Sequence, residues 1–123
     1  MATEQTTLDQ ADKLTLELRR GTLVLATLCQ LRSPKYGYSL VQDLAGHGLD
    51  VEQGTLYPLL RRLDEQGLLE STWNVEGSRP RKYYQLSATG TAVLEELSTQ
   101  WTDLVDVLSY LLDESEGDND GAH

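Results

Sequence analysis

Residues 53–63 read Gln53-Gly54-Thr55-Leu56-Tyr57-Pro58-Leu59-Leu60-Arg61-Arg62-Leu63, and this stretch decides the fold. Its four leucines recur at spacings of one, three and four, which places them on one face of a helix, while the two arginines fall mostly away from that face. We expect the helix to span Glu52 to Gln66 and to end at Gly67. Proline lacks the N–H that would bond the carbonyl of Gly54, so we expect a local bend at Pro58 within one continuous helix.

Two further helices are predicted upstream of this stretch. Residues 1–13 are polar and indicate a flexible N-terminal segment. Apolar residues at helical spacing then predict a helix over 14–31. The sequence at 33–37 breaks it, because Pro34 disfavours helix for itself and for the residue before it. A short helix is expected to resume near Tyr38, and the glycines of Gly46-His47-Gly48 end it.

Downstream of residue 67 the pattern changes to alternation and then returns to helix. Residues 69–75 alternate with period two and predict a strand, a turn follows at 76–80, and residues 81–86 form a second strand rich in aromatic side chains. Ser87 is a favourable N-cap for a last helix that ends near Leu112. Residues 113–123 are acidic and glycine-containing, which predicts a disordered tail.

The order of these elements indicates a mainly α fold with one β-hairpin. Three short helices followed by a hairpin are typical of a winged helix-turn-helix, in which the third helix is the recognition helix and the hairpin is the wing. We therefore expect a winged-helix DNA-binding domain over residues 14–86 and a long C-terminal dimerisation helix over 87–112.

The net charge of −10 argues against nucleic acid as a partner when the chain is taken as a whole. The distribution of charge is more informative, because nine of the ten cations lie between Arg19 and Lys82 and the acidic residues dominate both ends. A basic face can therefore be built from the middle of the chain. The alternative that suits the acidic balance is a winged-helix module that binds another protein and no DNA.

The candidate DNA contacts come from the start of the second helix, from the start and outer face of the recognition helix, and from the wing. The wing carries three cations within Arg79-Pro80-Arg81-Lys82, and phosphate is their expected partner. Gln53 and Thr55 could instead only cap the helix, Tyr57 could only pack, and the wing cations could be solvated surface. The full set of candidates is Tyr38, Gln53, Thr55, Tyr57, Arg61, Arg62, Arg79, Arg81 and Lys82.

The last helix carries more apolar surface than a small domain can cover. The positions Val93, Leu97, Trp101, Leu104, Leu108 and Leu111 step by three and four, and Leu94, Val105 and Leu112 add a second apolar edge. Such spacing suits packing against a partner helix. A two-fold homodimer would also present two recognition helices to two half-sites of double-stranded DNA.

Several classes of protein are excluded by composition. The only cysteine, Cys29, can form no internal disulfide, and with only His47 and His123 it builds no zinc site. The sequence lacks a long apolar run and the features of a signal peptide, so we expect a cytoplasmic protein. It contains no phosphate-cradling loop, serine elbow or paired carboxylates, so we expect neither enzymatic activity nor a bound cofactor.

Five short strings together resemble the PadR family of transcriptional regulators. They are Arg20-Gly21-Thr22-Leu23, Tyr36-Gly37-Tyr38, the run from Gly54 to Leu63, Gly67-Leu68-Leu69, and Arg79-Pro80-Arg81-Lys82-Tyr83-Tyr84-Gln85-Leu86. The resemblance covers residues 15–112, and the sequence is similar to the short subfamily with a single C-terminal helix. The sequence departs from the family at Glu52-Gln53, where members often have serine and proline.

The resemblance implies a dimer joined by the C-terminal helix, repression of transcription, and release from the operator by a small molecule. In multidrug-responsive short members, an aromatic residue of the last helix lines a pocket at the dimer interface, and Trp101 stands at the matching place. A planar aromatic effector would then contact Leu97, Trp101, Leu104, Val105 and Leu108. The competing interpretation is that Trp101 only fills the interface.

Overall fold

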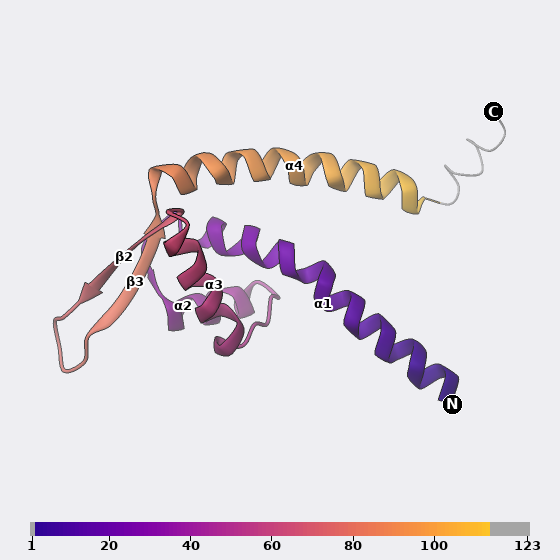
Figure 1. Ribbon diagram of the computed structural model, residues 1–123, viewed down its shortest axis with the longest axis horizontal. Coiled ribbons are helices and arrows are strands. Elements are labelled where there is room, and N and C mark those ends of the chain that lie inside the picture. Colours follow the sequence, from indigo (N-terminus) through magenta and orange to yellow (C-terminus); the bar gives the residue numbers. More distant parts are fainter. Residues whose placement is uncertain (1, 114–123) are drawn as a thin grey trace.

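A computed structural model describes residues 2–113 of the 123-residue chain. The elements are α1 (Ala2–Gln30), β1 (Lys35–Tyr36), α2 (Gly37–Gly46), α3 (Gln53–Glu65), β2 (Leu69–Asn74), β3 (Arg81–Leu86) and α4 (Ala88–Leu112). The body contains α2, α3 and the hairpin of β2 and β3, and α1 and α4 extend from one side of it as two arms (Figure 1). This confirms the predicted fold class, mainly helical with a hairpin and a long C-terminal helix. The predicted tail at 113–123 lies, apart from Asp113, outside the described residues.

The core lies where α1, α2, α3, the sheet and the start of α4 meet. It is built from leucine side chains contributed by every one of these parts: Leu28, Leu31, Leu40, Leu44, Leu56, Leu59, Leu60, Leu63, Leu69, Leu86 and Leu94. Burying one such side chain contributes about 1.5–3 kcal/mol to stability. The four leucines of α3 are all buried, as the sequence predicted, so the opposite side of this helix is turned outward.

The helix α3 continues through Pro58 as one element, which confirms that the proline does not split it. Gly67 follows with φ +80°, a conformation that favours glycine, and lets Leu68 N–H bond the Leu63 carbonyl at 3.0 Å. The chain therefore leaves α3 in a tight reversal that leads directly into β2.

The sheet has three strands in the order β1-β3-β2, all antiparallel. The alternating pattern predicted β2 and β3 but not β1, in which Lys35 and Tyr36 pair with Tyr84 and Tyr83. Two residues are too short to show a periodic pattern, so only the pairing reveals this strand. The turn between α1 and α2 is thereby attached to the wing.

The first helix begins at Ala2, so the prediction of a flexible segment over 1–13 with a helix starting only at Leu14 was wrong. Side-chain hydrogen bonds at helical spacing support its first turns, from Gln5 Nε2 to Asp9 Oδ1 at 3.1 Å and from Thr7 Oγ1 to the Thr3 carbonyl at 3.0 Å. Glu4 in the first turn complements the helix dipole. None of the helices within residues 2–113 is both long and apolar enough to cross a membrane.

The junction between the wing domain and α4 is closely packed. Ser87 caps α4 as predicted, accepting a hydrogen bond from Gly90 N–H at 2.9 Å and donating one to the Gly67 carbonyl at 2.6 Å. Gly90 is buried, and a side chain there would collide with the Leu68 carbonyl oxygen and meet Leu86 Cδ2 at 3.1 Å. The direction in which α4 leaves the domain therefore depends on glycine at this position.

We expect Gly90→Ala to lower the free energy of unfolding by about 1–3 kcal/mol, because the added methyl group must displace the backbone of Leu68. Urea unfolding followed by circular dichroism measures this. The control is Gly46→Ala at the end of α2, where nothing lies within 4 Å of the added atom, and we expect it to be neutral or slightly stabilising. A Gly90→Ala protein as stable as the parent would contradict the close packing of this junction.

Candidate nucleic-acid interface

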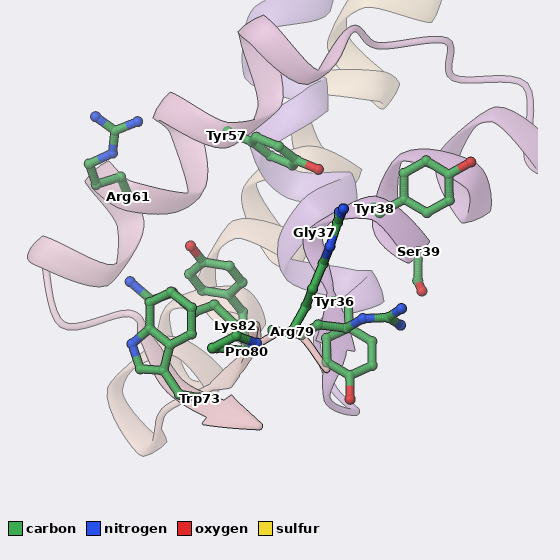
Figure 2. A pocket seen from close by; sticks show the side chains of 12 residues that line it. Tyr36, Gly37, Tyr38, Ser39, Tyr57, Arg61, Trp73, Arg79, Pro80 and Lys82 are labelled. Atoms are coloured by element: carbon green, nitrogen blue, oxygen red, sulfur yellow. The ribbon is translucent and has the colours of Figure 1, made fainter. Parts of the chain in front are cut away.

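A hollow of about 720 Å³ lies between the start of α2, the outer side of α3 and the wing (Figure 2). Tyrosine, tryptophan and cationic side chains dominate its lining, which consists of Tyr36, Gly37, Tyr38, Ser39, Tyr57, Arg61, Trp73, Arg79, Pro80, Arg81, Lys82 and Tyr84. Cations beside flat aromatic rings are suited to phosphate and to base or sugar edges. Of the residues that the structure describes, no acidic one belongs to this lining.

The structure brings together most of the residues predicted from sequence. Those in the hollow are Tyr38, Tyr57, Arg61, Arg79, Arg81 and Lys82. Gln53, Thr55 and Arg62 are exposed on α3 but lie outside the lining of this hollow. Thr55 instead lines a separate hollow with Arg19 and Arg20 of α1.

Tyr57 combines the two roles that the sequence left open. Its ring extends from α3 toward Gly37 and Tyr38 of α2 (Figure 2), and a Cβ atom at Gly37 would lie 2.8 Å from its Cε1. The side chain therefore packs closely against the backbone at the start of α2. It also remains 36% exposed and lines the hollow.

Tyr36, which was not among the predicted site residues, joins β1 to the wing. Its hydroxyl accepts a hydrogen bond from Asn74 Nδ2 at 2.7 Å, and its ring meets that of Tyr83 edge to face at 5.6 Å. The guanidinium of Arg81 lies 5.7 Å from the centre of the same ring. The string Tyr36-Gly37-Tyr38 was noticed only as part of a resemblance, and its contact with the wing depends on the unpredicted strand β1.

Lys82 has several partners of its own within the domain. Its Nζ lies 3.9 Å from Asp64 Oδ2 and stands 5.8 Å and 5.5 Å from the ring centres of Trp73 and Tyr84.

Burial and the Asp64 carboxylate raise the pKa of the Tyr84 hydroxyl above its usual value of 10.0, an effect that Arg61 partly opposes. Trp73 lies on the same face of β2 as the buried Leu69 but is 59% exposed, since the wing extends beyond the core.

The residues predicted to form an effector pocket lie together on the arm formed by α4. Leu97 packs partly against the core, whereas Trp101, Leu104, Val105 and Leu108 are exposed, Trp101 by 43%. Within residues 2–113 of a single chain, these side chains form one face of a helix, and no second element covers them to close a pocket. Within residues 2–113, no group of three or more His, Cys, Asp or Glu side chains is placed to hold a metal ion.

The chain is similar to transcriptional regulators across most of its length. The PadR-like family model of transcriptional regulators matches residues 24–96. A crystal structure of a PadR family transcriptional regulator from Eggerthella lenta is 51% identical, with a TM-score of 0.83, and the match covers 89% of this chain and 97% of that one. A transcriptional regulator of Mycobacterium tuberculosis is 44% identical over 61 residues, which are 50% of this chain and 57% of that protein.

A further solved structure is that of PadR from Bacillus subtilis in complex with operator DNA. It is 23% identical with a TM-score of 0.57, and the match covers 62% of this chain and 45% of that one, a likeness of fold. The family model spans more than half of the chain and includes the core of the domain, α3, the wing and the start of α4. The winged-helix assignment is thereby confirmed, and the chain belongs to the PadR-like family, whose members are transcriptional regulators and not enzymes.

Proposed function

We propose that this protein binds operator DNA through α3 and the wing and represses transcription as a homodimer. The observation that carries the proposal is the hollow in which exposed cations of the wing and of α3 stand beside tyrosine side chains. The PadR protein of Bacillus subtilis was solved with operator DNA, which supports the same partner for this chain. A protein with this function would act in the cytoplasm, where it meets the chromosome.

The two parts of the interface would have different tasks. The leucine face of α3 is buried, so Thr55, Tyr57 and Arg61 project away from the core and are available to the major groove. Arg79 and Arg81 are exposed on the wing and would bind backbone phosphates. Phosphate contacts supply affinity and register, while contacts to base edges supply sequence preference.

We expect Arg79→Ala combined with Arg81→Ala to weaken binding to all DNA sequences and to reduce the slope of log K against log salt by about 1 for each phosphate that the variant no longer binds. The assay is fluorescence polarisation with a random duplex and with the upstream region of the protein's own gene. Arg32→Ala is the control, because Arg32 is exposed beside α4 and outside the hollow. Parent-like binding by the double variant at physiological salt would contradict the assignment of the wing.

The same assay distinguishes base contacts from phosphate contacts. Thr55→Ala should weaken binding to the upstream region more than to the random duplex, since a base contact contributes only at the matching sequence. If the parent binds neither duplex, the result favours the alternative, a winged-helix module that binds another protein. The chain's net charge of −10 is compatible with such a module.

The apolar surface of the arms supports the homodimer. The apolar face of α4 that begins at the core extends along the helix beyond it. Its residues follow one another at alternating steps of three and four: Leu94, Leu97, Trp101, Leu104 and Leu108. Only its first part is covered, and the exposure of later leucines exceeds 45%. On α1, Leu8, Leu14 and Leu18 are likewise exposed. Large exposed apolar patches on a soluble domain mark contact with another chain.

We expect Leu104→Asp with Leu108→Asp to convert the protein to a monomer or an aggregate and to abolish operator binding, because two carboxylates would be buried in an apolar interface. Light scattering at micromolar concentration measures the mass. Thr99→Asp with Thr102→Asp, on the polar side of α4, is the control and should leave the dimer intact. A monomeric parent would refute the dimer.

The dimer would also complete the effector site. Trp101 offers a large flat face, and Leu97, Leu104, Val105 and Leu108 flank it on the same side of the helix. A second copy of α4 would supply the opposite wall, which makes a pocket suited to a planar aromatic compound. Binding there would shift the arms and thereby separate the recognition helices from their half-sites.

We expect Trp101→Ala to abolish binding of a planar dye, tested with acridine orange by fluorescence polarisation without DNA, while dimer mass and DNA affinity stay near those of the parent. Trp101→Phe should retain part of the affinity, because a smaller ring still stacks. Saturating dye should weaken binding of the parent to an immobilised operator fragment more than it weakens binding of Trp101→Ala, a comparison that removes the effect of dye bound to the DNA itself. Equal dye affinity in Trp101→Ala would assign this tryptophan to packing alone.

A further inference from the structure

We propose that Lys82 is a positioning residue that holds the wing against the recognition helix and does not itself bind phosphate. The inference rests on the proposed function, because it concerns which wing cations contact DNA. In the sequence, Lys82 stands beside Arg79 and Arg81 and was predicted to bind phosphate as they do. The contacts within the domain separate it from them.

Asp64 is the centre of these contacts. It lies near the end of α3, and its Oδ2 accepts a hydrogen bond from Ser71 Oγ of β2 at 2.7 Å. The same oxygen pairs with Lys82 Nζ of β3 at 3.9 Å. One carboxylate of the recognition helix therefore contacts both strands of the wing, and we call Asp64, Ser71, Trp73, Lys82 and Tyr84 the Asp64 cluster.

The strand register explains why the cluster forms on one face of the hairpin. Trp73 stands directly opposite Lys82, and Ser71 stands directly opposite Tyr84. Side chains two residues apart along a strand share a face, so all four point to the side on which α3 lies. The ammonium of Lys82 lies near the ring of Trp73 (Figure 2) and near the ring of Tyr84, at distances typical of cation–π contacts.

Arg81 is adjacent in sequence but belongs to the opposite face of the strand. It stacks on Tyr36 and is exposed, whereas the side chain of Lys82 is 33% exposed and that of Asp64 28%. A lysine that left this cluster for a phosphate would leave the Asp64 carboxylate without its cationic partner close to an anionic backbone. The pair remains together because separation would expose the DNA to a like charge.

This arrangement has a measurable consequence for DNA binding. A paired cation and carboxylate carry no net charge, so they displace no counterion from DNA, whereas an unpaired arginine that contacts a phosphate does. Lys82 should therefore influence affinity through the position of the wing and leave the salt dependence unaltered.

The experiment compares Lys82→Met, Arg81→Met and Asp64→Asn in binding to a random duplex over a series of salt concentrations. We expect Arg81→Met to reduce the slope by about 1. Lys82→Met is combined with Asp64→Asn so that no unpaired carboxylate faces the DNA, and this double variant should weaken binding by about 3- to 10-fold with the slope of the parent, the size expected when a surface ion pair and a cation–π interaction are removed. Asp64→Asn releases the lysine and should steepen the slope by about 1, an increase that disappears when Lys82→Met is added.

A second measurement follows the wing without DNA. In a Trp101→Phe background, Trp73 is the one remaining tryptophan, and its time-resolved fluorescence anisotropy reports motion of the wing. Lys82→Met and Asp64→Asn should both add fast motion of Trp73, and Arg81→Met should add none. Unchanged anisotropy in both cluster variants would refute the positioning role.

The two proposals fail in different ways. If the double variant Lys82→Met with Asp64→Asn reduces the salt slope as much as Arg81→Met does, Lys82 contacts phosphate and the positioning role is wrong, while DNA binding stands. If the parent binds no duplex, the proposed function is refuted, and the anisotropy alone decides whether the Asp64 cluster holds the wing.

Discussion

The burial of one face of α3 is the constraint on which the rest of the structure depends. At most 2% of the surface is exposed at Leu56, Leu60 and Leu63, and 7% at Leu59. A helix of 13 residues with four leucines in the core cannot rotate without exposing them, at about 1.5–3 kcal/mol for each side chain. This rotational setting decides which side chains face outward, so Tyr57 and Arg61 line the hollow because of where the leucines lie.

The wing takes its place from the same helix. Gly67 reverses the chain immediately after α3 and leads into β2, while the Asp64 carboxylate at the end of α3 contacts Ser71 and Lys82 across the hairpin. β1 then joins the start of α2 to the other edge of β3. The helix, the wing and the start of α2 thus form one connected unit, and none of the residues that line the hollow between them comes from α1 or α4.

Much of this fold could be predicted because its elements carry strong local signals. The leucine spacing marks α3, alternation marks β2, and Ser87 marks the start of α4. The start of α1 could not be predicted, because polar residues such as Gln5 and Thr7 support the helix through side-chain hydrogen bonds that apolar periodicity does not reveal. β1 was missed because a two-residue strand is defined only by its partner. The candidate site was likewise predictable in composition but not in the roles of individual residues, since the separation of Lys82 from Arg81 depends on Asp64, which reaches the wing only through the fold.

The distribution of charge allows an acidic protein to present a basic surface. The described acidic residues of α4, Glu95, Glu96, Asp103 and Asp106, lie along an arm that extends away from the hairpin (Figure 1). With a rise of 1.5 Å per residue, Asp103 stands about 22 Å along the helix axis from its start, more than two Debye lengths at physiological salt. Closer to the hollow, Asp43 pairs with Lys35 at 2.9 Å and Asp64 pairs with Lys82. These two acids are each matched by a lysine. Glu76 borders a neighbouring hollow with Arg79 and Arg81, and none of the described acidic residues belongs to the lining of the hollow between α2, α3 and the wing, where the arginines lie.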